Sequence, residues 1–396
     1  MMYTETIKLE SVITDIAAGP FGSNLKVSCF VDYGFPIIDG ANLKGFKVTD
    51  NVTKFVTEEK ARSLHRSIAK RNDVIVTISG TLGQIAYIPE NSMFEEYLCS
   101  QRQFRVSFDT ERVFVPYLVY YFHSREGQHK ILSFANQTGV PALSQPLKNF
   151  RNIEVDLPDI DTQKQIASVM LSLDDKIELN TAINENLEQQ AQTLFKAWFA
   201  DFEPFGGVMP DDWRIGTASE IIELHDSKRV PLSGAERDKM DKIYPYYGAT
   251  SRMDYVDNYL FDGIYLLLGE DGTVIDANGF PILQYVYGKF WVNNHAHIIT
   301  GKLGYTVESL YLLFSLTNIK HIVTGAVQQK VSQANLKKVP VIIPNAHSLE
   351  RFNTIIQPIF ATIRNYRDEN ERLAALRDTL LPKLMNGEID VSAVKI

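Results

Sequence analysis

Residues 159–202 read DIDTQKQIASVMLSLDDKIELNTAINENLEQQAQTLFKAWFADF, and this stretch decides the fold. Apolar residues recur in alternating steps of four and three from Ile166 to Trp198, which is the pattern of a helix that pairs with another helix. No Gly or Pro interrupts the pattern. At ~1.5 Å per residue, about 42 residues of helix span roughly 60 Å, too long for the core of one compact domain. The stretch therefore predicts a rod that needs a partner helix.

Local signals mark both ends of this rod. Asp161 or Thr162 can cap its start, and Gln165 follows Thr162 at the spacing of a capping box. The run Phe205-Gly206-Gly207 is expected to end it.

The chain supplies a partner helix from Ser348 to about Met385. Pro358 is expected to kink this second helix early, and Pro382 to end it or bend its last turn. Asn184 and Asn370 interrupt the apolar seams, where buried amides can fix register and the two amides are expected to hydrogen-bond to each other across the seam; a wet, loosely packed patch is the alternative. The residues predicted to form the two seams are Ile166, Leu173, Ile177, Asn180, Asn184, Leu187, Leu194, Phe352, Ile359, Ile363, Asn370, Leu373 and Leu380.

An offset of 186 residues relates the two halves of the chain. It maps residues 150–158 onto 336–344, aligns Thr138-Gly139 with Thr324-Gly325, and superimposes the two long helices without a gap. Further upstream the offset drifts to 193, where Ser100-Gln101 meets Asn293-Asn294. The succession of strand, proline, cap and long helix thus occurs twice, which indicates an internal duplication.

The predicted fold class is mixed α/β (α+β): two globular units of short strands and helices, separated by a long antiparallel two-helix coiled coil, with an internal pseudo-two-fold repeat. The expected domains are a first globular unit at 1–157, a central long helix at 158–205, a second unit at 206–344 and a distal long helix at 345–396. Two separated heads suit a target with two separated half-sites, such as a DNA duplex read at two places.

Within the globular units the expected elements are short. The first unit is predicted to hold strands at 74–78, 85–88, 103–108 and 153–157 and a helix from 116 to about 132. The second is predicted to hold strands at 265–268, 284–287, 290–292, 297–300 and 339–343 and a helix at 308–316.

Composition sets the broad class. With 396 residues the chain exceeds the usual size of one domain, and Cys29 and Cys99 form no metal-binding spacing. The start lacks a signal region and no 18-residue apolar run occurs, so we expect a cytoplasmic protein. Of the net charge of −8, most lies in residues 156–205, which hold ten acidic and three basic side chains. The globular units are nearly neutral, which leaves room for local basic faces that bind a phosphate backbone.

Catalytic motifs are absent from the sequence. It contains no P-loop, no dinucleotide-binding glycine fingerprint and no Asn/Asp-Pro-Pro-Tyr/Phe run of the kind amino-methyltransferases use. His295 and His297 are interpreted as ordinary polar strand positions, so no metal ligands are predicted. Glu270-Asp271 is interpreted as a turn able to face a cytosine amino group, because nothing links the nearest downstream lysine, Lys289, to a nuclease site. No catalytic residue is therefore expected.

The plan of the whole chain resembles the specificity (S) subunit of Type I restriction-modification systems. The two long helices look like that family's central and distal conserved regions, and GPFGSNLK near residue 19, TGVPALSQ at 138 and GEDGT at 269 look like features of its target-recognition domains. The resemblance implies that each globular unit reads one half of a split DNA sequence. It implies that the helices set the unread spacer and dock two modification (methyltransferase) subunits, to which restriction (endonuclease/translocase) subunits attach. S-adenosylmethionine, ATP and Mg²⁺ are then expected on partner subunits, with no cofactor in this chain and no membrane partner.

For DNA contact we favour turn residues that carry amides, hydroxyls and basic groups, because such groups position phosphates or read base edges. In the first unit these are Ser23, Asn24, Lys26, Asn42, Lys44, Thr81, Gln101, Arg102 and Lys148. In the second they are Lys228, Arg229, Thr250, Ser251, Arg252, Asn293, Asn294, Gln328, Gln329, Lys330 and Gln333. Two rival functions stay open from the residues alone: a nuclease with its own metal site, and a two-headed scaffold that binds only proteins.

Overall fold

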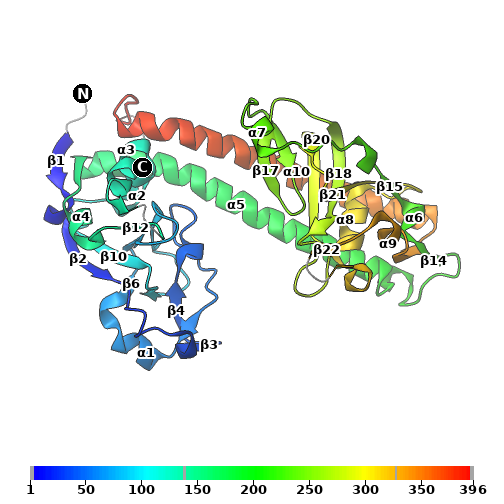
Figure 1. The fold of residues 1–396 in the computed structure, drawn as a ribbon, viewed down its shortest axis with the longest axis horizontal. Coiled ribbons are helices and arrows are strands. Elements are labelled where there is room, and N and C mark those ends of the chain that lie inside the picture. Colours follow the sequence, from blue (N-terminus) through cyan, green and yellow to red (C-terminus); the bar gives the residue numbers. More distant parts are fainter. Residues whose placement is uncertain (1–3, 137–139, 326–327, 393–396) are drawn as a thin grey trace. The chain divides into compact units, whose positions relative to one another are not determined.

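Two 40-residue helices, α5 (Ile160–Phe199) and α10 (Ala346–Met385), dominate the computed structural model (Figure 1). The structure describes residues 4–136, 140–325 and 328–392, so the predicted pair Thr138-Gly139 lies outside the described residues. The chain divides into two compact units, residues 1–178 with 370–396 and residues 179–369, and each long helix contributes to both. Pro358 and Pro382 both lie inside the continuous α10. Within the described ranges no helix is long and apolar enough to span a bilayer.

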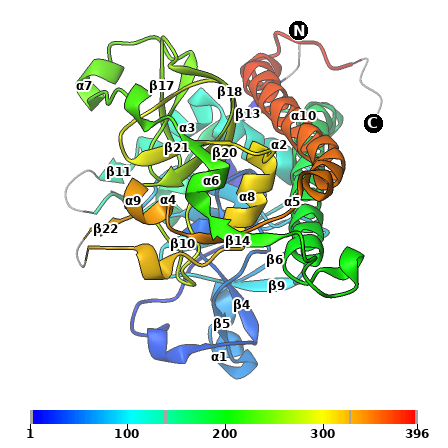
Figure 2. The same ribbon diagram turned by 90° about the vertical axis from the view of Figure 1, so that its right-hand side faces the viewer.

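The helices are antiparallel within each unit, as predicted, and they lie side by side in both views (Figures 1 and 2). In the first unit the Asn370 amide donates to the Ile177 carbonyl at 3.3 Å. In the second unit the Asn184 amide donates to the Ile363 carbonyl at 3.4 Å. These two bonds are equivalent under the offset of 186, so the duplication extends to the seam contacts. Each amide bonds the backbone of the opposite helix, which is a contact that depends on register.

The caps of both helices also repeat, and both lie two or three residues before the predicted ones at Asp161 or Thr162 and at Ser348. Asp159, and not Asp161 or Thr162, accepts from the backbone N–H of Thr162 at 3.0 Å. Asn345, 186 residues later, accepts from the N–H of Ser348 at 2.7 Å. The pattern of an Asx residue followed three positions later by a hydroxyl residue therefore caps both helices.

The end of α5 was predicted too late. The helix stops at Phe199, because Phe202 has a left-handed backbone (φ 54°) and its carbonyl accepts from the N–H of Gly207 at 2.9 Å. The Phe202 ring packs on Trp213 with centroids 6.0 Å apart. A tertiary contact thus ends the helix before the glycines do.

The seam prediction holds in part. Ile166, Phe352 and Ile363 are buried, whereas Leu173, Ile177, Leu187, Leu194, Ile359, Leu373 and Leu380 are only half-buried. Phe360 and Leu381 are buried instead of their seam neighbours. The Phe360 ring packs on Tyr285 and Tyr311, with centroids 5.1 and 5.8 Å away. The helix faces are therefore shared between the opposite helix and the globular part of each unit.

The first unit is built on a four-stranded sheet of order β2-β10-β7-β8 and a five-stranded sheet of order β3-β5-β4-β9-β6. Its strands are β1 (Thr4–Lys8), β2 (Ile13–Ala18), β3 (Phe30–Val31), β4 (Phe35–Ile38), β5 (Phe55–Val56), β6 (Ile68–Lys70), β7 (Val74–Thr77), β8 (Ile85–Tyr87), β9 (Glu96–Cys99), β10 (Gln103–Phe108), β11 (Ala135–Asn136), β12 (Ala142–Leu143) and β13 (Glu154–Pro158). Its helices are α1 (Glu58–Ser63), α2 (Val115–His123), α3 (Arg125–Leu132) and α4 (Pro146–Arg151).

The second unit holds a six-stranded sheet of order β15-β21-β18-β20-β16-β17. Its strands are β14 (Arg214–Thr217), β15 (Ile222–Leu224), β16 (Tyr244–Tyr247), β17 (Arg252–Val256), β18 (Phe261–Gly269), β19 (Asp271–Gly272), β20 (Leu283–Val292), β21 (Ala296–Gly301), β22 (Gln329–Lys330) and β23 (Pro340–Ile343). Its helices are α6 (Ala218–Ile221), α7 (Gly234–Arg237), α8 (Val307–Ser315) and α9 (Gln333–Leu336).

Topology confirms the internal repeat. The order β2-β10-β7-β8 corresponds to β15-β21-β18-β20, and the closing pair β1-β13 corresponds to β14-β23. Among the named strands of the described residues, each unit has one parallel pair, β4 with β9 and β16 with β20. The strand pairs within the two corresponding four-strand orders are all antiparallel.

Two predicted elements differ from the structure. The helix expected from 116 to 132 is two helices, because Ser124 is extended and its hydroxyl caps α3 by accepting from the N–H of Gly127. The strands expected at 284–287 and 290–292 are one strand, β20. Gly288 looks like a turn residue, but it pairs with Gly263 of β18 inside the ladder.

Candidate nucleic-acid interface

In the first unit three loop segments meet where β7 ends and β10 begins. The N–H of Ile78 donates to the Arg102 carbonyl at 2.6 Å, and the N–H of Gly80 donates to the Pro141 carbonyl at 3.0 Å. The N–H of Leu143 returns to the Ile78 carbonyl at 2.8 Å. These bonds hold residues 79–81, 100–102 and 140–145 together at one edge of the sheet, which we call the loop edge.

The second unit has an equivalent loop edge, formed by residues 270–273, 293–295 and 328–333. The N–H of Glu270 donates to the His295 carbonyl, and the N–H of Val331 donates to the Glu270 carbonyl, both at 2.8 Å. Gly80 and Gly272 occupy the same place and have left-handed backbones, with φ of 97° and 93°. A side chain at either position would be strained, so glycine is required for this turn.

A cleft of about 460 Å³ lies at the loop edge of the first unit. Leu25, Phe30 and Ile37 contribute apolar walls, and polar groups of Asp39, Lys54, Thr77, Ser79, Thr81, Gln84, Gln101 and Arg102 line the rest. Lys54 Nζ lies 2.5 Å from Asp39 Oδ2. Burial pushes the pKa of the Asp39 carboxyl upward, but the hydrogen bond from Lys54 and the N–H of Ala41 outweigh it and lower that pKa.

The loop carrying GPFGSNLK joins this edge. Gln101 Nε2 donates to the Leu25 carbonyl at 2.6 Å, and a Cβ on Gly19 would lie 1.8 Å from the Ser100 carbonyl oxygen. Ser23, Asn24 and Lys26 are exposed on this loop, and Phe21 is 83% exposed beside them. The structure thus brings together six of the nine residues predicted to contact DNA in the first unit: Ser23, Asn24, Lys26, Thr81, Gln101 and Arg102.

The other three lie elsewhere. Asn42 is buried, and its amide donates to the Thr49 and Asn51 carbonyls at 3.1 Å, so this side chain holds a turn. Lys44 lines a separate cleft beside Arg377 of α10. Lys148 is exposed on the short helix α4.

In the second unit Asn294, Gln328, Gln329 and Lys330 gather at the loop edge, where β19 pairs with β22. Thr250 and Ser251 form the neighbouring turn between β16 and β17, with the N–H of Gly248 bonded to the Ser251 carbonyl at 2.9 Å, and Arg252 begins β17. Lys228 is exposed in a short 3₁₀ helix (Asp226–Lys228).

Three residues predicted to contact DNA in this unit are instead occupied internally. Arg229 pairs with Glu270 at 2.6 Å, and Gln333 Nε2 donates to Asp226 at 2.5 Å. Asn293 is buried, and its side-chain oxygen accepts from the N–H of His295 at 2.8 Å. The partners of Arg229 and Gln333 lie 41 and 107 residues away, so residue type alone could not assign these two side chains a structural role.

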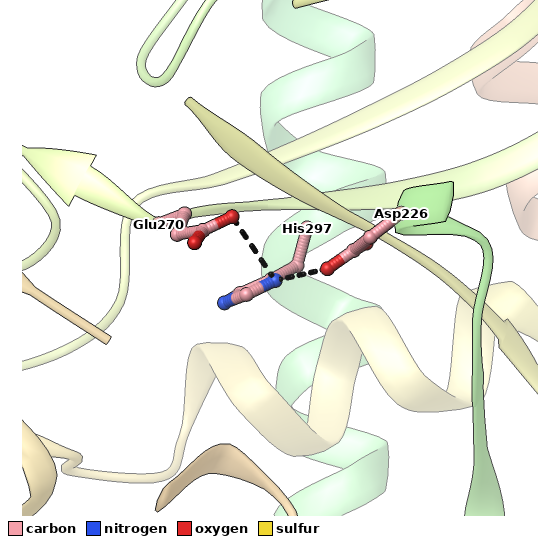
Figure 3. A group of neighbouring side chains, drawn as sticks. All are labelled: Asp226, Glu270 and His297. Carbon is pink, nitrogen blue, oxygen red and sulfur yellow. Dashed lines mark hydrogen bonds and ion pairs between the residues drawn. The ribbon is translucent and has the colours of Figure 1, made fainter. Parts of the chain in front are cut away.

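Behind this edge lies a cluster of Asp226, Glu270 and His297, in which Asp226 and His297 are buried and Glu270 is half-buried (Figure 3). His297 Nδ1 lies 2.6 Å from Asp226 and 3.7 Å from Glu270, and its Nε2 lies 2.7 Å from the Val331 carbonyl. Burial raises the pKa of the Asp226 carboxyl, but the bond to His297, the N–H of Ile298 and the charge of Arg229 outweigh it, so that pKa is lowered.

These three residues are close enough to share a metal ion, yet their surroundings favour an ionic network. Both ring nitrogens of His297 already face oxygen atoms, and the guanidinium of Arg229 contacts both carboxylates. Lys330 Nζ adds a second cationic side chain, 3.4 Å from Glu270. Lys330, and not Lys289, is therefore the lysine near Glu270, which corrects the sequence-based search for an acid–lysine pair. The cluster ties the 226–229 segment to the loop edge.

Sequence reasoning singled out the turn at Glu270-Asp271 but missed Ser79 and His295 as residues of the loop edges. Aligning Ser79-Gly80-Thr81 with Asp271-Gly272-Thr273 would have found Ser79, because both runs begin two residues after an apolar strand ends. His295 Nδ1 hydrogen-bonds the Asp271 carboxylate. The equivalent pair in the first unit is Arg102 and Ser79.

Comparison with known proteins agrees with this duplicated plan. The sequence matches the Type I restriction modification DNA specificity domain twice, over residues 22–189 and 210–375. It is 25% identical to the Type I restriction enzyme MjaIX specificity subunit of Methanocaldococcus jannaschii over 362 residues, covering 85% of this chain and 82% of that protein. It is 24% identical over 318 residues to the HindI specificity subunit of Haemophilus influenzae, covering 60% of this chain and 69% of that one.

The fold is similar to a crystal structure of the Type I restriction-modification S subunit from M. genitalium. The TM-score is 0.59 at 15% identity, over 97% of this chain and 96% of that chain. The chain therefore belongs to the family of Type I restriction-modification specificity subunits and carries two specificity domains.

Proposed function

We propose that each unit of this specificity subunit reads one half of a bipartite DNA site through its loop edge. The observation that carries the proposal is the repetition of one backbone arrangement with different exposed side chains in the two units. A repeated frame holds the loops in one geometry, and the differing amides, hydroxyls and charges supply two different sequence preferences.

The long helices are proposed to set the length of the unread spacer and to dock two modification (methyltransferase) subunits, to which restriction subunits attach. The acidic character of α5 supports contact with proteins or water and not with a phosphate backbone. Methyl transfer, cleavage, S-adenosylmethionine, ATP and Mg²⁺ are assigned to those partner subunits, and this chain is proposed to be non-catalytic. We place the complex in the cytoplasm, where the DNA is.

The test is single-molecule sequencing of methylated adenines in DNA from cells that express this chain with its modification and restriction subunits. The expected result is one methylated motif split by a fixed gap, and no such motif in cells that express only the partner subunits. A methylated motif that persists without this chain would contradict the proposal.

The nuclease alternative has one favouring observation, which is the contact of Glu270 with Lys330 at 3.4 Å. Against it, Arg229 already pairs with Glu270 and contacts Asp226, where a metal ion would have to bind. Purified chain incubated with DNA and Mg²⁺ should show no cleavage, whereas cleavage that Glu270→Ala abolishes would support the nuclease. A chain that still binds its protein partners but shows no preference for any DNA sequence would instead support the protein-only scaffold.

A further inference from the structure

The two loop edges differ most at one pair of equivalent positions. In the first unit, Ser79 and Arg102 occupy the places that Asp271 and His295 occupy in the second. The backbone arrangement is the same in both units. The N–H of Ile78, which precedes Ser79, donates to the Arg102 carbonyl, and the N–H of Glu270, which precedes Asp271, donates to the His295 carbonyl. One frame thus presents a cation in the first unit and a histidine–carboxylate pair in the second.

Arg102 is exposed on the rim of the 460 Å³ cleft, and its guanidinium lies over Gly80, with Nη1 3.7 Å from where a Cβ of that glycine would be. Among the residues that the structure describes, its side chain has neither a hydrogen-bond acceptor nor an acidic partner. A guanidinium offers only donors, in a planar fork. Among base edges in the major groove, guanine alone offers two acceptors, O6 and N7, that match this fork.

Asp271 has the opposite character. Its side chain is 21% exposed, and one carboxylate oxygen bonds His295, which is 46% exposed. A carboxylate only accepts, so it suits a base edge that donates. Cytosine offers its amino group without an acceptor at the neighbouring major-groove position, whereas adenine places N7 beside its amino group and would repel the carboxylate.

Buried amides hold both loops in place. Gln103, fully buried, accepts from the N–H and hydroxyl of Ser100 at 3.3 and 3.0 Å. Asn293 accepts from the N–H of His295 at 2.8 Å. These two residues are positioning residues, which fix the segments that carry Arg102 and His295.

We propose that Arg102 reads a guanine in one half-site and that Asp271, oriented by His295, reads a cytosine in the other. This inference rests on the proposed function, because it requires that the two units read separate half-sites. It goes further by assigning a base and a residue to each unit.

The alternative for Arg102 is a phosphate, which also offers paired acceptors but carries no sequence information. The two contacts predict different consequences. Loss of a base contact relaxes the preference at one base pair, whereas loss of a phosphate contact weakens all sequences about equally and reduces the salt dependence of binding.

The experiment measures binding of the full chain, assembled with its modification subunits, to duplexes that carry the motif or each single-base variant of it, at several salt concentrations. Arg102→Gln should lower the preference for guanine at one position of one half-site by roughly ten-fold or more, and Asp271→Asn should do the same for cytosine in the other half-site. Arg102→Lys should lose the preference yet keep the salt dependence, because it keeps the charge without the fork.

Matched controls lie at the far ends of the same strands. Arg112→Gln removes a cation beyond the opposite end of β10, and Asp262→Asn removes an acid near the start of β18. Neither should alter base preference. Unchanged preference in Arg102→Gln or Asp271→Asn, or uniform weakening with a smaller salt dependence, would overturn the inference while leaving the split motif intact. A wild-type complex with no split preference would instead overturn the proposed function.

Discussion

At the scale of single residues, the close approach of Gly19 to Ser100 explains why the GPFGSNLK loop begins with glycine. Its ideal Cβ would lie 1.8 Å from the Ser100 carbonyl oxygen, which is backbone and cannot easily move aside. Gly19→Ala should therefore lower the free energy of unfolding of the first unit by about 1–3 kcal/mol. Thermal unfolding measures this loss. Gly45→Ala is the control: no atom lies within 4 Å of its ideal Cβ, so a shift equal to that of Gly19→Ala would contradict the explanation.

His123 predicts a pH dependence. Burial is the largest influence and lowers the pKa of His123, and the charge of Arg377 lowers it further. The Ile85 carbonyl, which lies 2.7 Å from Nε2, raises this pKa, but the net effect is a lowering. The unfolded chain then takes up a proton at about pH 6.5, before the folded one does. Stability contributed by the neutral ring is present above that pH and is lost as the pH falls below it.

Thermal unfolding at pH 7.5 and 5.5 measures this effect. His123→Gln keeps a donor for the Ile85 carbonyl but cannot titrate, so the variant should lose less stability than wild type on acidification. An identical loss in both proteins would exclude His123 as the cause. The comparison with the variant is needed because burial also lowers the pKa of His225 in the second unit.

At the scale of elements, a tyrosine, an acid and an arginine join the helix beside each sheet to the long helices. In the first unit the Tyr120 hydroxyl bonds Asp174, which lies 2.8 Å from Arg377. In the second unit Tyr311 bonds Glu188, which lies 3.9 Å from Arg367. Tyr120 and Tyr311 come from the corresponding helices α2 and α8, so both units use the same kind of attachment.

Asp174→Ala tests this attachment. Asp174 is buried, and its loss leaves the Tyr120 hydroxyl and the Arg377 guanidinium without their acceptor, so we expect a cost of about 3 kcal/mol in the first unit. Its neighbour Asp175 is 64% exposed and pairs with Lys47, so Asp175→Ala should cost at most about 1 kcal/mol. Chemical unfolding would compare them, and equal costs would show that the buried network contributes nothing special.

Long elements with a regularly repeated apolar pattern could be predicted from the sequence, whereas short elements held by distant contacts could not. The pattern of four and three residues places both long helices within a few residues, because their seams are local in sequence. The one-strand β20 was read as two, since only its partner Gly263 shows that Gly288 continues the ladder. The end of α5 depends on the Phe202–Trp213 contact, which no local pattern contains.

The same limit applies to the candidate interface. Exposed turn residues such as Arg102 and Thr81 could be proposed from residue type and turn signals. Arg229 and Gln333 have the same residue types but bond Glu270 and Asp226, 41 and 107 residues away, so only the fold assigns them an internal role. The turn at Asp271 could be proposed from its glycines and acids, whereas Ser79 could have been recognised by comparing the two halves of the chain.

At the scale of the whole molecule, the proposed spacer role predicts that helix length sets the gap in the target. Inserting one heptad after Asn184 and one after Asn370 preserves both seams and adds ~10 Å of helix. The gap between the half-sites, read from methylated DNA, should lengthen by roughly three base pairs, since base pairs stack ~3.4 Å apart. Replacing an existing heptad with the inserted sequence is the control. An active complex with an unchanged gap would rule out the spacer role.

The claim that the two units read independent half-sites is tested most directly by exchanging one of them. Residues 206–343 would be replaced with the corresponding segment of another specificity subunit, and methylated adenines would be mapped by single-molecule sequencing in cells that hold the partner subunits. The account predicts that one half of the motif changes while the other half stays as in wild type. A motif altered in both halves, or in neither, would contradict it.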